Sequence, residues 1–223
     1  MELPSICFKF PYIFISFFII LHIVIFFLII KFIPNVEKLP FLWGMITWTI
    51  AIAVVFYGFG IFIPSDSDSL KILRAILGGI IPPITEDIGR LIVFTFIYKS
   101  KNHNFNNSLI FGAGHGGWES IVLMSINQIT NLVNFYTIKN YKDEEELIKN
   151  NLLKIYNKYK NGITGEEILG VILRFGGNLF HMAASVIIYR LSLNRKKKIY
   201  YLFYNFIFKS FFRGYIWPIF HFI

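Results

Sequence analysis

Long apolar runs, separated by short polar linkers, limit this chain to folds in which lipid surrounds much of the surface. The first two runs, Phe10 to Ile33 and Phe41 to Ile63, contain no acidic side chain. A helix needs roughly 20 apolar residues to cross the hydrocarbon core. Irregular backbone cannot satisfy its hydrogen bonds there. The pattern therefore predicts an all-α, polytopic membrane helix bundle.

Four more apolar runs raise the expected number of transmembrane spans to about six. They are expected near residues 70–98, 109–133, 167–191 and 200–223. Residues 141–161 instead alternate charged and apolar side chains at helical spacing, which is typical of an amphipathic helix at the membrane interface. The sequence contains no internal repeat, so a single transmembrane domain over residues 1–223 is predicted.

The positive charge of the chain is best explained by membrane topology. The net charge is +9, but many basic residues lie in short linkers between apolar runs, where topology signals occur. This distribution argues against nucleic acid as a partner. Cys7 is the only cysteine, which excludes an internal disulfide framework and a cysteine-based metal cluster. We expect a multi-pass protein of a bacterial-type plasma membrane, in contact with membrane lipid.

Three of the expected spans carry ionisable side chains, which cost about 2.5–3.5 kcal/mol each at the middle of a membrane helix. Glu86 and Arg90 are four residues apart and share a helix face. His115 and Glu119 have the same spacing. His22, isolated among aliphatic residues in the first span, is interpreted as a packed or snorkelling histidine.

The fifth span carries a polar stripe along one helix face, at spacings of four, three and four residues. Its members are Arg174, Asn178, His181 and Ser185. At a rise of about 1.5 Å per residue, Glu86, His115 and His181 each lie roughly 12–20 Å from the same membrane face. We therefore expect these three side chains to meet in one layer.

Two backbone features accompany these polar residues. Pro82 and Pro83 precede Glu86, so a kink or an unwound turn is expected there. Four glycines surround His115 in the stretch FGAGHGGWES. They would let neighbouring backbones approach closely, or they would thin the helix beside a water-filled cavity.

The chain resembles a known superfamily at these residues. Glu86 with Arg90 (ExxxR), Phe111 with His115 (FxxxH) and His181 with Ser185 (HxxxS) are similar to three motifs of the CAAX-protease and bacteriocin-processing superfamily of intramembrane proteases. The GxGHGxxE pattern at 112–119, and Arg174 before His181, resemble its YhfC branch. The resemblance covers the third to fifth spans and implies an intramembrane endopeptidase that cleaves a peptide or membrane-protein substrate.

The resemblance also implies catalytic roles. Glu86 would activate water as a general base, and His115 would hold that water or protonate the leaving amine. His181, with Ser185, would stabilise the oxyanion. The supporting residues are Arg90, which would orient Glu86, and Glu119, Arg174, Asn178 and Ser185. The chain departs from the superfamily in having Thr85 where a second glutamate is frequent, and Ser185 where asparagine is usual.

A metal is the main open question about this site. Carboxylates and imidazoles are zinc ligands, and a metal-dependent enzyme would use Glu86, His115, Glu119 and His181. However, HGGWE is not the HExxH motif, because no general base lies between its two ligand positions. The sequence therefore favours a glutamic mechanism without a metal cofactor, with zinc as the alternative.

Other functions remain compatible with the sequence. Proton- or ion-coupled transporters also place Glu, His and Arg in broken helices near the membrane midplane. The chain could instead be a catalytically inactive membrane scaffold. Glu86 and Arg90 could also be a purely structural ion pair.

Overall fold

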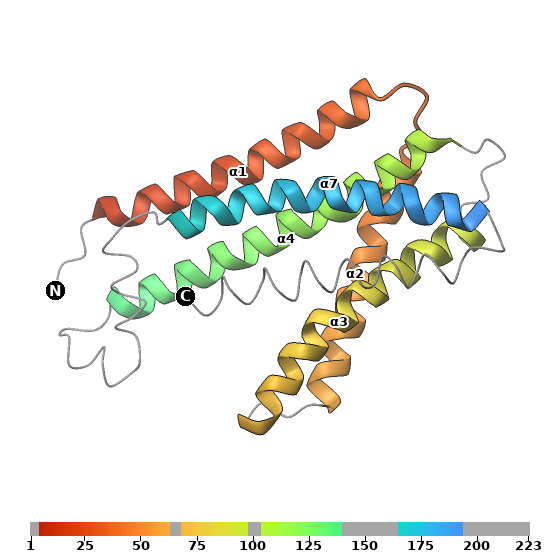
Figure 1. The fold of residues 1–223 in the computed structure, drawn as a ribbon. Coiled ribbons are helices and arrows are strands. Elements are labelled where there is room, and N and C mark those ends of the chain that lie inside the picture. The colour runs from red at the N-terminus through yellow and green to blue at the C-terminus, as the bar shows by residue number, and fades with distance from the viewer. Residues whose placement is uncertain (1–4, 63–67, 98–103, 140–164, 194–223) are drawn as a thin grey trace. The chain divides into compact units, whose positions relative to one another are not determined.

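The computed structural model describes residues 5–62, 68–97, 104–139 and 165–193, and their regular structure is entirely helical (Figure 1). No strand occurs within these four ranges. The all-α prediction is therefore confirmed for this part of the chain. The expected amphipathic helix at 141–161 and the expected span at 200–223 lie outside the described residues.

The described helices follow the apolar runs, and their ends differ from those of the runs by a few residues. The helices are α1 (Ser5–Phe32), α2 (Leu39–Phe62), α3 (Asp68–Ile92), the π-helical η1 (Val93–Ile97), α4 (Phe105–Lys139) and α7 (Gly165–Leu193).

The number of membrane spans is only partly supported. Within the described ranges, one segment is long and apolar enough to cross a membrane by composition alone, Ile168–Leu193 of α7. Ser16–Ile29 and Leu39–Val55 are apolar but shorter. The prediction of six spans is therefore not confirmed.

The distribution of side chains is inverted relative to that of a water-soluble protein. Buried side chains include Glu86, Asp87 and Arg90, whereas Phe27 and Phe96 are 69% and 70% exposed. Burying charges while exposing large apolar groups is unfavourable in water. In a bilayer the same arrangement places apolar groups against lipid and ionisable groups inside the protein.

The helices fall into two compact units. The first comprises residues 1–28 and 119–176, and the second comprises residues 29–118 and 177–223. Helices α1, α4 and α7 each contribute a segment to both units. The prediction of a single transmembrane domain is not tested by this division and stays a prediction.

In the first unit, His22 of α1 packs against α7. Its ring stacks on Phe175, with the ring centroids 4.1 Å apart, and its Nδ1 donates a hydrogen bond of 2.8 Å to the carbonyl of Phe18. The side chain is buried. The structure therefore supports the interpretation of His22 as a packed histidine.

In the second unit, α2 and α3 pack side by side (Figure 1).

Asparagine side chains at the start of α4 hydrogen-bond to the linker before α2. The side chains of Asn104 and Asn106 donate to the carbonyls of Asn35 and Pro34, at 2.6 and 3.0 Å. Asn35 has a φ of 55°, a left-handed conformation that asparagine tolerates better than most residues. These bonds fix the entry of α2 beside α4.

The expected unwound turn before Glu86 is wrong. Helix α3 continues through Pro82 and Pro83, and the first departure from α-helical bonding is η1, after Ile92. Two prolines remove only two N–H groups from the ladder. In the same turn, the hydroxyl of Thr85 donates to the carbonyls of Ile81 and Pro82. Side-chain bonds of this kind help a membrane helix to tolerate proline.

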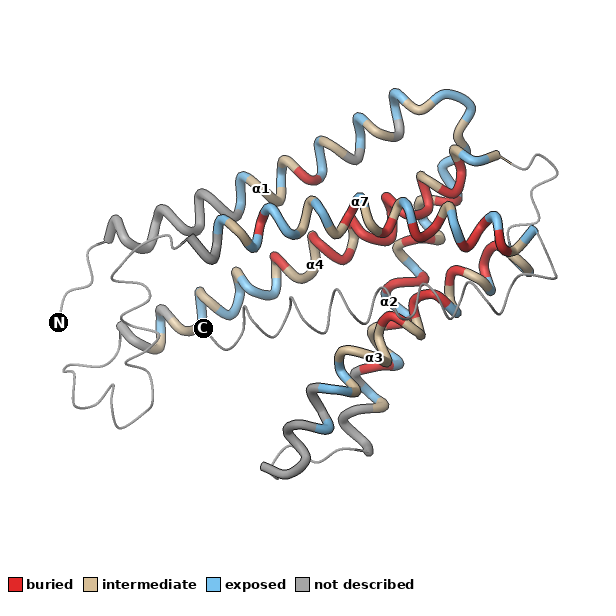
Figure 2. Tube along the Cα trace, viewed as in Figure 1, coloured by how far each residue is buried: buried red, intermediate tan, exposed pale blue. Residues whose placement is uncertain are grey.

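The glycine-rich stretch of α4 is the most buried part of the second unit. Every residue of 110–117 is buried (Figure 2). A Cβ atom added to Gly112 would lie 2.6 Å from the carbonyl oxygen of His181, and one added to Gly114 would lie 2.9 Å from the carbonyl carbon of Phe41. These glycines therefore bring α4 into backbone contact with α7 and α2, as one of the two sequence interpretations expects.

Gly112→Ala should therefore destabilise the protein. The new methyl group would meet the α7 backbone at His181 and Met182, and overpacking of this kind costs about 1–3 kcal/mol. The measurement is thermal or denaturant unfolding in detergent. Gly177→Ala on α7 is the matched control, because no atom of the described residues lies within 4 Å of its added Cβ. Equal stability of the two variants would contradict the close approach.

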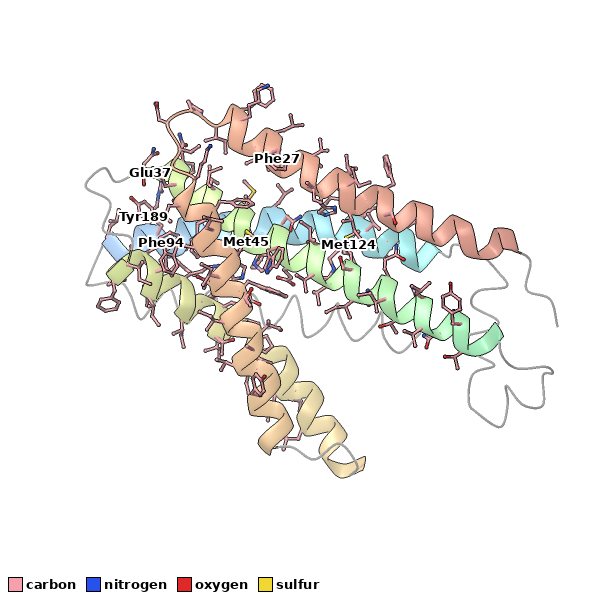
Figure 3. The ribbon with its side chains drawn as sticks, turned by 180° about the vertical axis from the view of Figure 1, so that it is seen from behind. Phe27, Glu37, Met45, Phe94, Met124 and Tyr189 are labelled. Carbon is pink, nitrogen blue, oxygen red and sulfur yellow. The ribbon has the colours of Figure 1, made fainter. Side chains whose placement is uncertain are left out.

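A small apolar core in the second unit lies beside the buried polar residues. It contains Val93, Phe94, Phe111, Ile188 and Tyr189. Figure 3 labels Phe94 and Tyr189, whose rings meet edge to face with centroids 5.4 Å apart. Phe111 lies one helical turn before His115 on α4, so this core fixes the rotation of α4 near the polar residues.

Candidate active site

Glu86 of α3 lies at the centre of a buried polar cluster in the second unit. Its Oε2 is 3.5 Å from the Nη2 of Arg90, 3.5 Å from the Nε2 of His115 and 3.9 Å from the Nδ1 of His181. Glu86 is 3% exposed, so these neighbours, rather than bulk solvent, determine its environment.

Three helices supply this cluster. Helix α3 contributes Glu86 and Arg90, α4 contributes His115, and α7 contributes His181. The rings of His115 and His181 have centroids 5.0 Å apart. The sequence prediction that Glu86, His115 and His181 meet in one layer is therefore confirmed as geometry. Their catalytic roles stay predictions.

The glycines of α4 create the space for this meeting. A Cβ on Gly116 would lie 2.9 Å from the Cδ2 of His181 and 3.0 Å from the Oδ1 of Asn178. A Cβ on Gly44 of α2 would lie 2.7 Å from the backbone nitrogen of His115. A larger residue at Gly116 would displace the His181 side chain, and one at Gly44 would displace the α4 backbone that carries His115.

Arg90 makes its shortest contacts with groups other than Glu86. Its Nη1 donates to the Oδ1 of Asp87 at 2.5 Å, and its Nη2 is 2.6 Å from the Nδ1 of His181. Arg90 is fully buried. It therefore bridges α3 to α7, and its ion pair with Glu86 is the longer interaction.

Asp87 is the site residue that the sequence interpretation missed. It is 4% exposed and pairs with Arg90. The available signal was its spacing of three residues before Arg90, which places the two side chains on one helix face as effectively as a spacing of four.

The polar stripe of α7 is present in the structure. Asn178, His181 and Ser185 are buried, and Arg174 is partly buried. The hydroxyl of Ser185 makes no hydrogen bond within the described residues. A buried hydroxyl in this state has an unused donor, one turn after His181.

Glu119 and Arg174 belong to the first unit and pair with each other. The Nη1 of Arg174 is 3.4 Å from the Oε1 of Glu119. Glu119 is buried, and it follows His115 by one turn of the continuous helix α4. Helical geometry therefore gives Glu119 and His115 the same face of α4.

The donor atoms of the second unit are suited to a metal ion. Glu86, His115 and His181 each offer one ligand atom, and these atoms lie within 4.8 Å of one another. Zinc bonds of about 2.0–2.1 Å give a tetrahedral site with edges of roughly 3.3 Å. The 3.5 Å separation of Glu86 Oε2 and His115 Nε2 is close to such an edge. Neither ring nitrogen of His115 has a hydrogen bond within the described part of the chain.

These features define a class: helical membrane proteins with a buried carboxylate–imidazole site. A sequence profile of one such family, described as YhfC intramembrane metalloprotease, matches residues 15–216. The chain belongs to this family. The resemblance seen at the ExxxR, FxxxH and HxxxS motifs is thereby confirmed.

One curated relative gives the same assignment. The uncharacterized membrane protein YhfC of Bacillus subtilis (strain 168) is 29% identical over 125 residues. The alignment covers 54% of this chain and 48% of the relative, so the chain spans about half the length of the curated relative it matches. No solved structure matches the chain.

The family description bears on the metal question. It names a metalloprotease, and the second unit contains a buried cluster of carboxylate and imidazole groups. Membrane residence is supported, and the protease activity of this chain stays a prediction. The sequence preference for a mechanism without a metal is not supported, and the glutamic mechanism stays a prediction.

Proposed function

We propose that this chain is a metal-dependent intramembrane endopeptidase, which hydrolyses a peptide bond of a membrane-embedded or membrane-associated substrate. The observation that carries the proposal is the 3.5 Å approach of Glu86 Oε2 to His115 Nε2, in a buried cluster that also contains His181. Ionisable groups are expensive at membrane depth, and function is the usual reason that they are present there.

The candidate metal ligands are Glu86, His115, Glu119 and His181. Two carboxylates and two imidazoles have the composition of a zinc site, and Glu119 joins the set through its place one turn after His115 on α4. When bound, the metal would polarise the scissile carbonyl and make a bound water more acidic. The chain's own residues would orient the substrate and move protons.

Glu86 is the proposed acceptor of the water proton, through a carboxylate oxygen. Arg90, 3.5 Å away, offsets the negative charge that Glu86 brings into a buried position. His115 is close enough to share that proton, because its Nε2 faces Glu86 Oε2. This pairing would pass a proton from water towards the leaving amine.

His181 and Ser185 are the proposed donors to the oxyanion. Both are buried, and they lie one turn apart on the same face of α7. Their burial would strengthen a hydrogen bond to developing negative charge, because no bulk water competes for it.

Ser185→Ala should lower turnover with little change in stability. The Ser185 hydroxyl has no hydrogen bond within the described residues, so its removal leaves no described group unpaired. Losing one oxyanion donor costs roughly 10²–10³-fold in kcat. The measurement is kcat for cleavage of a transmembrane peptide, together with unfolding in detergent. A variant with wild-type kcat would remove Ser185 from the site.

Removal of metal is the direct test of the proposed function. Purified protein in liposomes, supplied with a single-span transmembrane peptide carrying a fluorophore and quencher, should cleave the peptide. A zinc chelator should abolish cleavage, because it removes the ion from the site, and added zinc should restore cleavage by refilling the site. Chelator-resistant cleavage would contradict metal dependence and favour the glutamic mechanism.

Measurements of ion movement and peptide cleavage in the same liposomes distinguish the protease from the two other proposed classes of function. A transporter would move protons or ions across the bilayer without cleaving peptide, and a scaffold would do neither. We propose membrane lipid and a peptide or membrane-protein substrate as partners, and the plasma membrane as the location. The exposed apolar side chains of α1 and α2 support a lipid environment.

A further inference from the structure

The contact between Arg90 and His181 fixes which nitrogen of His181 carries the proton. Arginine can only donate hydrogen bonds and stays protonated in proteins. The 2.6 Å separation of Arg90 Nη2 and His181 Nδ1 therefore requires Nδ1 to accept. The ring hydrogen of His181 must then be on Nε2, because a second donor at Nδ1 would face the guanidinium.

This tautomer removes His181 from the set of possible metal ligands. A metal needs an unprotonated ring nitrogen with an available lone pair. The lone pair of Nδ1 points at Arg90, and Nε2 carries hydrogen. Binding through Nε2 would place a proton on Nδ1, opposite the Arg90 donor. Binding through Nδ1 would require Arg90 to move.

Asp87 holds Arg90 in position. The Oδ1 of Asp87 accepts from Nη1 of Arg90 at 2.5 Å, while Nη2 of the same guanidinium contacts His181. Both residues of the pair are buried, Arg90 at 0% exposure and Asp87 at 4%. Moving Arg90 would leave the Asp87 carboxylate buried without this partner, which is strongly unfavourable.

His115 differs from His181 in this respect. Neither of its ring nitrogens makes a hydrogen bond within the described residues, although the ring is fully buried. His115 therefore has a nitrogen available to a metal, and its Nε2 already lies 3.5 Å from Glu86 Oε2.

We propose that Asp87 and Arg90 form a positioning pair that fixes His181 as an Nε2–H donor and withholds it from the metal. The ligands that remain in the second unit are Glu86 and His115, and catalytic zinc sites likewise keep a position open for water or substrate. Arg90 then has a second role beyond its ion pair with Glu86. The inference rests on the proposed function only for its metal part, because the tautomer is a property of the metal-free protein.

The tautomer is tested first, without metal. The chain has five histidines, so ¹⁵N NMR of protein labelled at the histidine rings can resolve His181, with His181→Gln identifying its signals. The wild-type protein should show a protonated Nε2 and an unprotonated Nδ1 at His181. Arg90→Met should change that pattern, and Arg190→Met, at an exposed position near the end of α7, should not. A protonated Nδ1 in the wild type would overturn the inference.

The ligand set is tested second, by X-ray absorption at the zinc edge of zinc-loaded full-length protein. One imidazole per zinc is expected in the wild type, and two in Arg90→Met, because His181 is then released to bind. If Arg90→Met does not fold, Asp87→Asn is measured in its place, and the same increase in the number of imidazoles per zinc is expected. Two imidazoles in the wild type would overturn the inference and leave the proposed function intact. Wild-type protein that binds no zinc would overturn the metal-dependent function, and the NMR result alone would then decide the inference.

Discussion

Glu86→Gln should lower peptide cleavage by roughly 10²–10⁴-fold, the range that a positioned general base contributes. Glutamine preserves the shape of the side chain but cannot accept a proton or carry the negative charge. The carboxylate oxygen Oε2 lies within 3.5–3.9 Å of Arg90, His115 and His181, so the loss affects every member of the cluster. The measurement is single-turnover cleavage of a fluorogenic transmembrane peptide in liposomes.

The variant should remain folded, because Arg90 keeps its 2.5 Å hydrogen bond to Asp87. Unfolding in detergent checks this expectation. Glu37→Gln is the matched control, since Glu37 is exposed in the linker before α2 and lies outside the cluster. Wild-type cleavage by Glu86→Gln would exclude both the metal-dependent and the glutamic mechanism.

The helices were predictable because lipid leaves few alternatives. Runs of apolar residues long enough to span a bilayer must satisfy their backbone hydrogen bonds internally. The bounds of α1 and α2 accordingly fall close to those of the apolar runs. The unwound turn expected at Pro82 and Pro83 was wrong, because a local rule about proline takes no account of the side-chain bonds that Thr85 adds in the same turn.

The meeting of Glu86, His115 and His181 was predictable from spacing and depth, because helical periodicity determines both. The partners of Arg90 were not. Spacing alone allows Arg90 to pair with either Glu86 or Asp87, and the choice depends on where α7 places His181. That placement depends in turn on Gly112, whose missing side chain lets the backbones of α4 and α7 come into contact.

The preference for a mechanism without metal came from reading one helix at a time. The motif HGGWE lacks a general base between its ligand positions, and that reasoning is valid for ligands on a single helix. In the structure the buried carboxylate and imidazole groups of Glu86 and His115 come from α3 and α4. A search for single-helix motifs cannot detect candidate ligands that lie on different helices.

His115→Ala should weaken metal binding strongly and abolish cleavage. His115 is the imidazole whose nitrogens are available, and its Nε2 approaches Glu86 Oε2 at 3.5 Å. Loss of a residue that only supports a ligand lowers metal affinity about 10- to 100-fold. Loss of a ligand itself should exceed that range, so zinc affinity measured with a competing chelator should fall by more than about 100-fold.

His22→Ala provides the matched control for this substitution. His22 is also a buried histidine of a membrane helix, 1% exposed against 0% for His115. Its ring stacks on Phe175 in the first unit, so its removal should lower stability through lost packing but leave zinc affinity unchanged. If the two variants lose zinc equally, the effect of His115→Ala is a general consequence of a destabilised bundle. If only His115→Ala loses zinc, the metal depends on the imidazole beside Glu86.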